Sequence, residues 1–139
     1  MNAPLYTTEI LRLAASLKEP RQLEREDGRA EVRSPTCGSR IETVVQLDDG
    51  GHVAAMSQRV HACAFGQAAS ALLEQGAVGR GRQEVSNGVR ELGAWLDGAD
   101  VVPHWPGIEA LAPARPRKAR HGALLLPFRA LLAALDSRR

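Results

Sequence analysis

The stretch Ser34-Pro35-Thr36-Cys37-Gly38-Ser39 holds the first of the two cysteines in this sequence, and Val60-His61-Ala62-Cys63-Ala64-Phe65-Gly66 holds the second. Pro35 keeps its predecessor extended, and Gly38 permits a backbone turn that a side chain would resist. Cys63 stands at the start of an alanine-rich helical pattern, where unpaired N–H groups and the helix macrodipole favour a thiolate. Both sulfurs are therefore expected at chain turns that present them, which suggests a shared metal or sulfur site.

Alternating apolar and polar residues surround both cysteines. The alternation runs over residues 29–33, 40–47 and 52–60, and turn signals at Asp27-Gly28 and at residues 48–51 flank the runs. This pattern predicts three antiparallel strands. The first cysteine then falls in the connection between the first two strands, and the second falls just after the third strand.

Helical spacing predicts the segments that flank the strands. A first helix is expected after the N-cap candidates Thr7 and Thr8 and before Pro20. A second helix is expected over residues 64–75, with Gly76 placed to cap its C-terminus. The many alanine and serine residues of the second helix predict that it lies close to a neighbour.

The C-terminal part of the chain is predicted to be helical as well. An amphipathic pattern over residues 85–96 is followed by a short helix or turn at 103–111 and a Pro/Ala/Arg linker at 112–118. Because Pro127 lacks an N–H group, the last helix is expected to begin only a few residues before it. His121 would then stand at or just ahead of the helix N-terminus, where the dipole favours the neutral imidazole that a metal requires.

Composition favours one compact domain over residues 1–139. Hydrophobic residues make up 44% of the chain and aromatic residues 4%, which predicts an aliphatic, small-residue core. The net charge is only +2, with acidic and basic residues interspersed, so nucleic acid is not expected as a partner. No stretch is long and apolar enough to span a bilayer, so a membrane is not expected either. In the cytoplasmic location that we expect, free thiols or metal ligands are more common than a structural disulfide.

The order of these elements and motifs resembles a known family. Pro-Thr-Cys-Gly lies in the first strand connection, Cys-Ala-Phe-Gly-Gln-Ala-Ala-Ser opens a helix, and a basic segment leads into the last helix. This order resembles the U-type iron–sulfur cluster assembly scaffolds, the NifU-like N-terminal domain, over nearly the whole chain. The resemblance implies an α+β fold, with a three-stranded antiparallel sheet packed against about four to five helices, and a scaffold protein that is not an enzyme.

The resemblance also implies a set of site residues. Cys37 matches the first family cysteine and Cys63 the second, whereas the position of the third family cysteine is occupied by His121. The aspartate of the family's Cys-Gly-Asp motif is Ser39 here. Ser39 and His61 are further candidate ligands. Thiolate and imidazole both suit zinc and the iron of iron–sulfur clusters.

For this site the resemblance implies a cargo and partners. The cargo would be a transient iron–sulfur cluster, [2Fe–2S], built with sulfur from a pyridoxal-phosphate cysteine desulfurase and passed to apo iron–sulfur acceptor proteins. Two alternatives stay open: a zinc-bound acceptor of persulfide sulfur, and a degenerate, metal-free relative that acts as a binding protein. Residues 114–118 replace the family's chaperone-recognition motif, so that chaperone is not expected as a partner.

A basic run precedes the third candidate ligand and has two interpretations. Arg115, Arg117, Lys118 and Arg120 could form a solvated linker, which is the usual role of a short charged run. Alternatively, positive charge beside the site would favour thiolates and offer a docking patch to an acidic partner such as the desulfurase. RNA binding is not expected, because no aromatic residues are interleaved to stack on bases.

Overall fold

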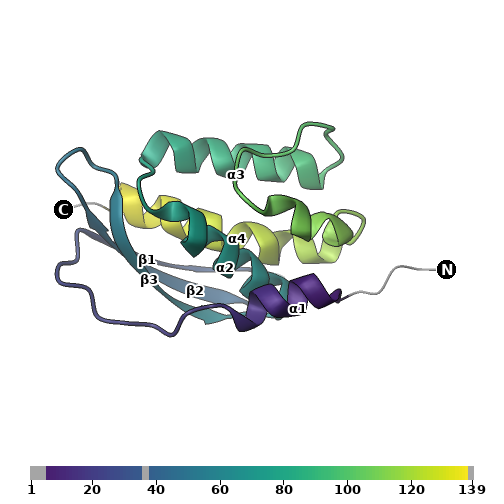
Figure 1. The fold of residues 1–139 in the computed structure, drawn as a ribbon, viewed down its shortest axis with the longest axis horizontal. Coiled ribbons are helices and arrows are strands. Elements are labelled where there is room, and N and C mark those ends of the chain that lie inside the picture. The colour runs from purple at the N-terminus through teal and green to yellow at the C-terminus, as the bar shows by residue number, and fades with distance from the viewer. Residues whose placement is uncertain (1–5, 36–37, 138–139) are drawn as a thin grey trace.

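The computed structural model of the protein describes residues 6–35 and 38–137. In this part of the chain a three-stranded antiparallel sheet is followed and preceded by helices, which confirms the predicted α+β class (Figure 1). The elements are α1 (Thr8–Ala15), β1 (Gly28–Arg33), β2 (Arg40–Leu47), β3 (Val53–His61), α2 (Ala64–Ala77), α3 (Arg82–Leu96), the 3-10 helix η1 (Ile108–Ala114) and α4 (Lys118–Asp136). None of the described helices is long and apolar enough to cross a membrane.

The sheet has β2 in its centre, antiparallel to β1 on one side and β3 on the other. Alternation along β2 turns Ile41, Thr43 and Val45 to the core, where all three are fully buried. The residues between them point to the opposite, outer face of the sheet. The two faces therefore differ in chemistry, with an apolar face under the helices and a polar face outside.

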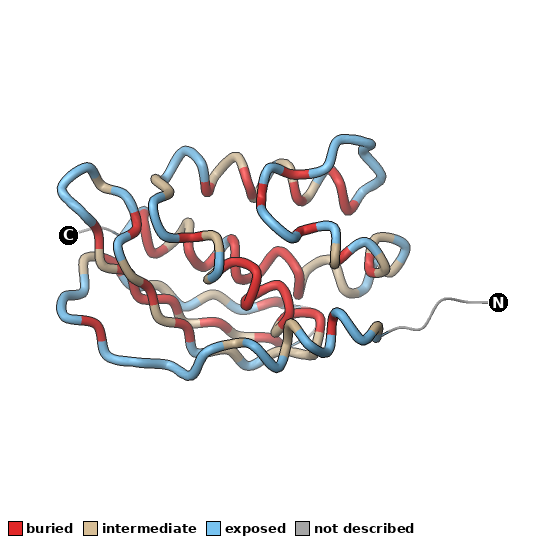
Figure 2. The backbone as a smooth tube through the Cα atoms, in the orientation of Figure 1, coloured by how far each residue is buried: buried red, intermediate tan, exposed pale blue. Residues whose placement is uncertain are grey.

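The helices cover one face of the sheet in two layers. α4 packs on β1 and β2, α2 packs on β3, and α3 contacts α4 from the side away from the sheet (Figure 1). Buried residues concentrate where α2 and α4 meet the sheet and each other (Figure 2). α1 lies against α2, and its N-cap is Thr7, whose side chain accepts a hydrogen bond from the Ile10 N–H at 3.1 Å, as the sequence predicts.

The connection between α1 and β1, residues 16–27, runs along the outer face of the sheet (Figure 1). Leu23 of this connection and Val44 on the outer face of β2 are both buried, and the two residues line the same hollow. The backbone N–H of Arg21 donates to Ser57 Oγ on β3 at 2.8 Å. The connection thus covers part of the polar face and leaves a groove along β3.

The start of α4 differs from the sequence prediction. The helix begins at Lys118 and not shortly before Pro127, so His121 lies in its first turn and not ahead of it. Pro127 removes only one backbone donor, and a helix tolerates that loss when packing supports it on all sides. The residues around Pro127, from Ala123 to Phe128, are all buried between the sheet and α3.

The end of α2 also differs from the prediction. Gly76 does not cap the helix but lies inside it, and the helix ends at Ala77. A Cβ atom at Gly76 would come within 2.8 Å of Trp105 Nε1, so the glycine makes room for the indole ring. The left-handed backbone that the prediction assigned to Gly76 occurs at Gly79, with φ +92°.

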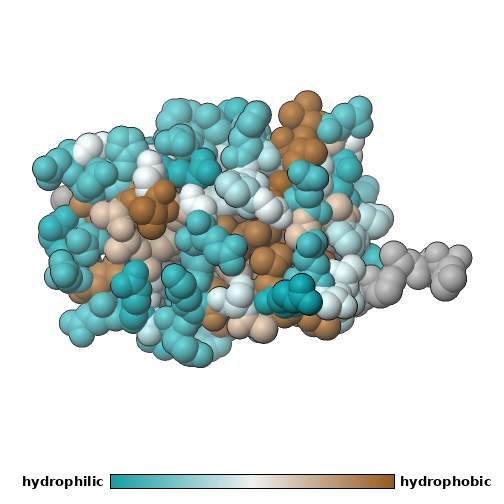
Figure 3. All heavy atoms as spheres, viewed as in Figure 1, coloured by the Kyte–Doolittle hydropathy of each residue, from teal (hydrophilic) through white to brown (hydrophobic). Residues whose placement is uncertain are grey.

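The predicted linker at residues 112–118 is helical at both ends and irregular only at residues 115–117. η1 continues through Ala114, and α4 already begins at Lys118. The helical pattern over residues 85–96 is confirmed by α3, and Gly98 follows it with φ +111°. Hydrophobic atoms gather on the surface over the connection between α3 and η1 (Figure 3), where Val101 and Val102 are exposed.

Candidate functional site

The β1–β2 connection and the β3–α2 junction meet at one end of the sheet. An open hollow of about 470 Å³ lies there, lined by Gly38, Ser39, Val60, His61, Ala62, Cys63 and Gln67. Three of these residues, Cys63, Ser39 and His61, were predicted as site residues from the sequence. The described residues therefore bring one predicted thiol, one hydroxyl and one imidazole to the same surface.

Cys63 is the N-cap residue of α2, as the sequence predicts. Its backbone is extended, with φ −67° and ψ 174°, and its carbonyl accepts the first helical hydrogen bond from the Gln67 N–H at 2.9 Å. Its thiol makes no capping hydrogen bond, is half-buried, and is free of any disulfide within the described chain. Because the helix does not use the thiol, the sulfur remains free for other chemistry at the hollow.

The β1–β2 connection approaches the hollow from the other side. The N–H of Ser34 donates to the carbonyl of Ser39 at 2.9 Å and closes the connection. Gly38 has φ +72°, the left-handed conformation for which the sequence placed a glycine. Cys37 lies outside the described residues, and its role as a ligand stays a prediction. Its chain neighbour Gly38 lines the hollow.

His61 ends β3 on the outer face of the sheet. It lies opposite Arg40 in the register, is exposed, and lines the hollow two residues before Cys63. The sequence could not determine its direction. The structure places the imidazole at the rim of the hollow, where no hydrogen bond between described residues occupies either ring nitrogen.

His121 has a different environment from the other candidates. Its Nε2 lies 2.8 Å from the carbonyl oxygen of Arg115 and 3.2 Å from that of Ala114. Since a carbonyl can only accept, Nε2 must carry a hydrogen, and Nδ1 is the nitrogen left for a metal. Nδ1 lies 3.9 Å from a carboxylate oxygen of Asp97, and the side chain is 12% exposed. His121 is not among the residues that line the Cys63 hollow, so its role as third ligand stays a prediction.

The N-terminal half of α4 nevertheless touches both cysteine-bearing segments. A Cβ atom at Gly122 would lie 3.6 Å from Ser34 Oγ, at the start of the β1–β2 connection. A Cβ atom at Gly66 of α2 would lie 3.5 Å from the Ala123 carbonyl. The three segments that carry the predicted ligands thus meet around one stretch of α4. Among the described residues, no three histidine, cysteine or acidic side chains come together closely enough to hold a metal ion.

The basic residues around the start of α4 differ in their environment. Arg115 stacks on Trp95 with its guanidinium carbon 4.8 Å from the ring centroid, and it donates to the carbonyls of Trp95 at 2.8 Å and Ala99 at 2.9 Å. These carbonyls lie at and just beyond the C-terminal end of α3, where a cation is favourable. Arg115 is therefore a clamp on α3, whereas Lys118 is exposed.

Sequence reasoning missed two residues of this region. Gln67 lines the hollow, and its Nε2 donates to the Ala62 carbonyl at 2.9 Å, beside Cys63. Its spacing of four residues from Cys63 on one helix was the available signal. Asp97 follows the last residue of α3, and nothing in its local sequence indicates that it lies near His121.

Comparisons with known proteins agree with this architecture. A crystal structure of a nitrogen-fixing NifU-like protein (N-terminal) from Brucella abortus is similar with a TM-score of 0.87 and 28% identity, covering 96% of this chain and 93% of that one. A structure of a putative iron–sulfur cluster assembly scaffold protein for the SUF system from Fervidobacterium islandicum is similar in fold, with a TM-score of 0.81 and 20% identity over 94% and 96% of the two chains. No protein-family model and no curated protein sequence matches the chain.

Proposed function

We propose that this chain, which has the fold of the U-type iron–sulfur cluster scaffolds, receives iron and sulfur, holds a cluster transiently and passes it to an acceptor protein. The observation that carries the proposal is the position of Cys63. It caps α2 without using its thiol and opens onto a hollow that also borders the β1–β2 connection. Cys63 packs partly against the apolar core, but a cysteine that only filled the core would be fully enclosed, and this one is half-buried beside the hollow.

The proposed ligands are Cys37, Cys63 and His121, with Ser39 and His61 as candidates for a further contact. Two thiolates and a neutral imidazole carry less negative charge than three thiolates, and histidine on a cluster iron raises the reduction potential. His121 would bind through Nδ1, because Nε2–H is held by the Arg115 carbonyl. The hydrogen bond from Nε2–H to the Arg115 carbonyl would fix the orientation of the ring while Nδ1 binds the metal.

Sulfur would arrive as a persulfide from a cysteine desulfurase. The Cys63 thiolate would attack the outer sulfur of the donor persulfide, so that a new S–S bond forms on Cys63 and the donor leaves as a thiolate. The open side of the hollow supports this step, since a donor thiol must reach Cys63 from solvent. Release to an apo iron–sulfur protein would use the same opening.

The test is to purify the protein anaerobically and measure bound iron and acid-labile sulfide. We expect the two in matching amounts in the wild type, and their loss in Cys37→Ser and Cys63→Ser. His121→Ala separates the ligand sets: loss of the cluster in this variant supports the imidazole as a ligand. A wild-type protein that takes up neither iron nor sulfide after reconstitution would contradict the scaffold function.

A second candidate function is a zinc-bound acceptor of persulfide sulfur on which no cluster forms. The position of His121 favours it, because the imidazole lies against the Ala114 and Arg115 carbonyls and 3.9 Å from Asp97, and does not line the Cys63 hollow, where a cluster with three protein ligands would need it. Zinc without sulfide, together with a persulfide on Cys63 after incubation with a desulfurase and cysteine, would support this candidate. Partner binding with neither metal nor persulfide would indicate the metal-free alternative.

A further inference from the structure

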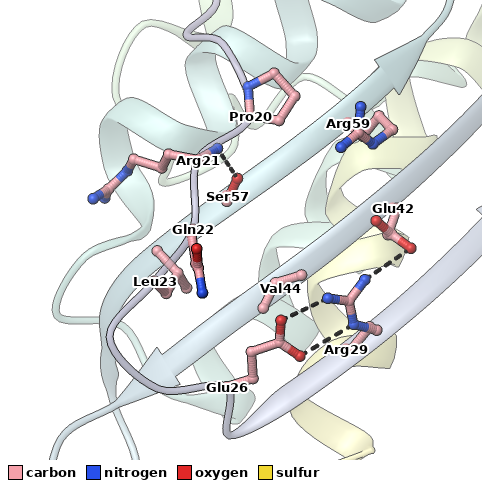
Figure 4. A pocket seen from close by; sticks show the side chains of 10 residues that line it. All are labelled: Pro20, Arg21, Gln22, Leu23, Glu26, Arg29, Glu42, Val44, Ser57 and Arg59. Carbon is pink, nitrogen blue, oxygen red and sulfur yellow. Dashed lines mark hydrogen bonds and ion pairs between the residues drawn. The ribbon is translucent and has the colours of Figure 1, made fainter.

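The outer face of the sheet carries positive charge that the fold leaves without acidic partners. Arg59 on β3 lies directly opposite Glu42 on β2. Glu42 nevertheless pairs with Arg29 at 2.9 Å, and Glu26 also pairs with Arg29 at 2.6 Å. Figure 4 shows Arg29 between these two carboxylates, while Arg59 stands apart with no ion pair to any described residue. The nearest acids therefore leave Arg59 available.

Arg59 and Pro20 line two neighbouring hollows, which we describe together as one groove. The hollow on one side has about 350 Å³ and includes Pro20, Arg21 and Arg59, and the hollow on the other side has about 430 Å³ and includes Lys18, Pro20 and Arg59. The second hollow also shares His61 with the Cys63 hollow. We call the surface formed by Lys18, Pro20, Arg21, Arg59, Val60 and His61 the Arg59 groove.

The hollows along the Arg59 groove are lined by both acidic and basic residues, but Glu26 and Glu42 are paired with Arg29, so the side chains left without an ion pair in the described chain are mostly basic. The side chains of Lys18, Arg21 and Arg59 form no ion pair with any described residue. Of the acidic residues that line the two hollows, only Glu19 has no ion pair within the described chain. β3 forms one wall of the groove, and the α1–β1 connection forms the other. The backbone N–H of Arg21 in this connection donates a hydrogen bond to Ser57 Oγ on β3 at 2.8 Å (Figure 4). A groove of this shape fits an extended chain, and unpaired cations favour carboxylates in it.

We propose that the Arg59 groove docks an acidic, extended segment of a partner protein. Arg59 precedes Cys63 by four residues, so at about 3.3 Å per residue their backbones are at most roughly 13 Å apart, and a segment docked at Arg59 lies near the thiol. A partner held there would carry its own reactive group to the open side of the Cys63 hollow. This inference deepens the proposed function by assigning the partner's docking surface, but its test needs no metal and no cluster.

The first test measures binding of a fluorescein-labelled decaglutamate peptide to the reduced, metal-free protein by fluorescence anisotropy at low ionic strength. We expect saturable binding that Arg59→Glu weakens about 10-fold. Arg129→Glu is the matched control, because Arg129 is exposed on α4, lines none of the three hollows and changes the net charge equally. Its affinity should stay within about 2-fold of the wild type.

Three results would overturn the inference. The wild type could fail to bind decaglutamate, or both charge reversals could weaken binding equally, which would indicate only a general attraction between charges. A ten-nucleotide single-stranded DNA could also bind more tightly than the peptide with the same dependence on Arg59, which would assign the groove to nucleic acid. Iron and sulfide uptake by Arg59→Glu is measured in parallel. If uptake is unchanged, a failure of the docking inference does not count against the scaffold function.

The second test asks whether the docked segment lies near Cys63. In a Cys37→Ser background, decaglutamate carrying a terminal thiopyridyl disulfide exchanges with the Cys63 thiolate, forming a mixed disulfide and releasing thiopyridone. Docking raises the effective concentration of the disulfide, so the reaction should be at least about 10-fold faster than with a matched decalysine peptide. The advantage should vanish in Arg59→Glu, and equal rates with both peptides would contradict the docking geometry.

Discussion

Helix α2 carries a glycine near each end, and the two glycines serve different neighbours. At the N-terminal end, a Cβ atom on Gly66 would lie 2.6 Å from the Ala62 Cβ and 3.5 Å from the Ala123 carbonyl. At the C-terminal end, a Cβ atom on Gly76 would lie 2.8 Å from Trp105 Nε1. Gly66 leaves room for a backbone carbonyl and a small side chain, whereas Gly76 leaves room for one of the two buried indole rings.

This difference separates reactivity from stability along one helix. The N-terminal end leaves the Cys63 thiol half-buried beside an open hollow. At the other end Trp105 is only 4% exposed, donates from Nε1 to the Leu72 carbonyl at 3.0 Å and packs edge-on against Phe128 with ring centroids 5.1 Å apart. A large, well-packed anchor at one end allows the other end to present a functional group.

Replacing the anchor should have the largest effect. Trp105→Ala removes the buried indole between α2 and α3, and we expect the free energy of unfolding to fall by about 3–5 kcal/mol, measured by urea denaturation. In a Cys37→Ser background and without denaturant, the folded variant should react with an aromatic disulfide reagent at Cys63 within about 2-fold of the unmutated rate. A stability loss below about 1 kcal/mol, or a much faster thiol reaction in the folded protein, would contradict the separation of the two ends.

The same substitution at the two glycines sharpens the comparison. Gly76→Ala gains helix propensity but presses on the indole, so a net loss of about 1–2 kcal/mol is expected with unchanged Cys63 reactivity. Gly66→Ala presses on Ala62, the residue before Cys63, and should displace the thiol. Its rate of modification should therefore change by about 3-fold or more at a similar cost in stability. Thiol kinetics and urea unfolding of both variants measure this, and matching thiol rates would contradict it.

Periodicity and turn residues predicted the strands and the helices because both depend on local sequence. Gly76 was misassigned as a helix cap. A glycine is needed there because the indole ring of Trp105, a residue distant in sequence, packs against the helix at that position. The start of α4 was placed too late because the proline signal is local, whereas the packing that supports the helix through Pro127 comes from the sheet and α3. Both errors arose where tertiary packing outweighed local preference.

The candidate site was predictable to the extent that a motif determines backbone geometry. The cap position of Cys63 and the left-handed Gly38 follow from residue type, and the structure has both. The direction of His121 does not follow from its motif, since it depends on the carbonyls of Ala114 and Arg115 and on Asp97 just after α3. The availability of Arg59 likewise depends on Arg29 binding the two nearest carboxylates.

The smallest effect is expected from Glu91, whose carboxylate holds the segment next to Trp105 against α3. Glu91 of α3 accepts hydrogen bonds from the backbone N–H of His104 and from its ring Nδ1, each at 3.0 Å, next to Trp105 in the chain. These bonds to His104, the backbone one first, lower the pKa of Glu91 below its ordinary value despite partial burial, because they favour the carboxylate. The ionised carboxylate therefore stabilises the folded state above the pKa of the unfolded glutamate, about 4.3.

This stabilisation is lost as the pH falls through the folded pKa of Glu91. Glu91→Gln should lower the free energy of unfolding at pH 7 by a few tenths of a kcal/mol, because the group is partly exposed and solvent screens it. Melting temperatures of both proteins from pH 7 to pH 3 should converge at the acidic end, where the wild-type carboxyl is protonated too. Cys63 reactivity at pH 7 should be the same in both, since the change lies at the opposite end of α2. A difference in melting temperature that stays constant across this range would show that the carboxylate does not fasten the Trp105 end.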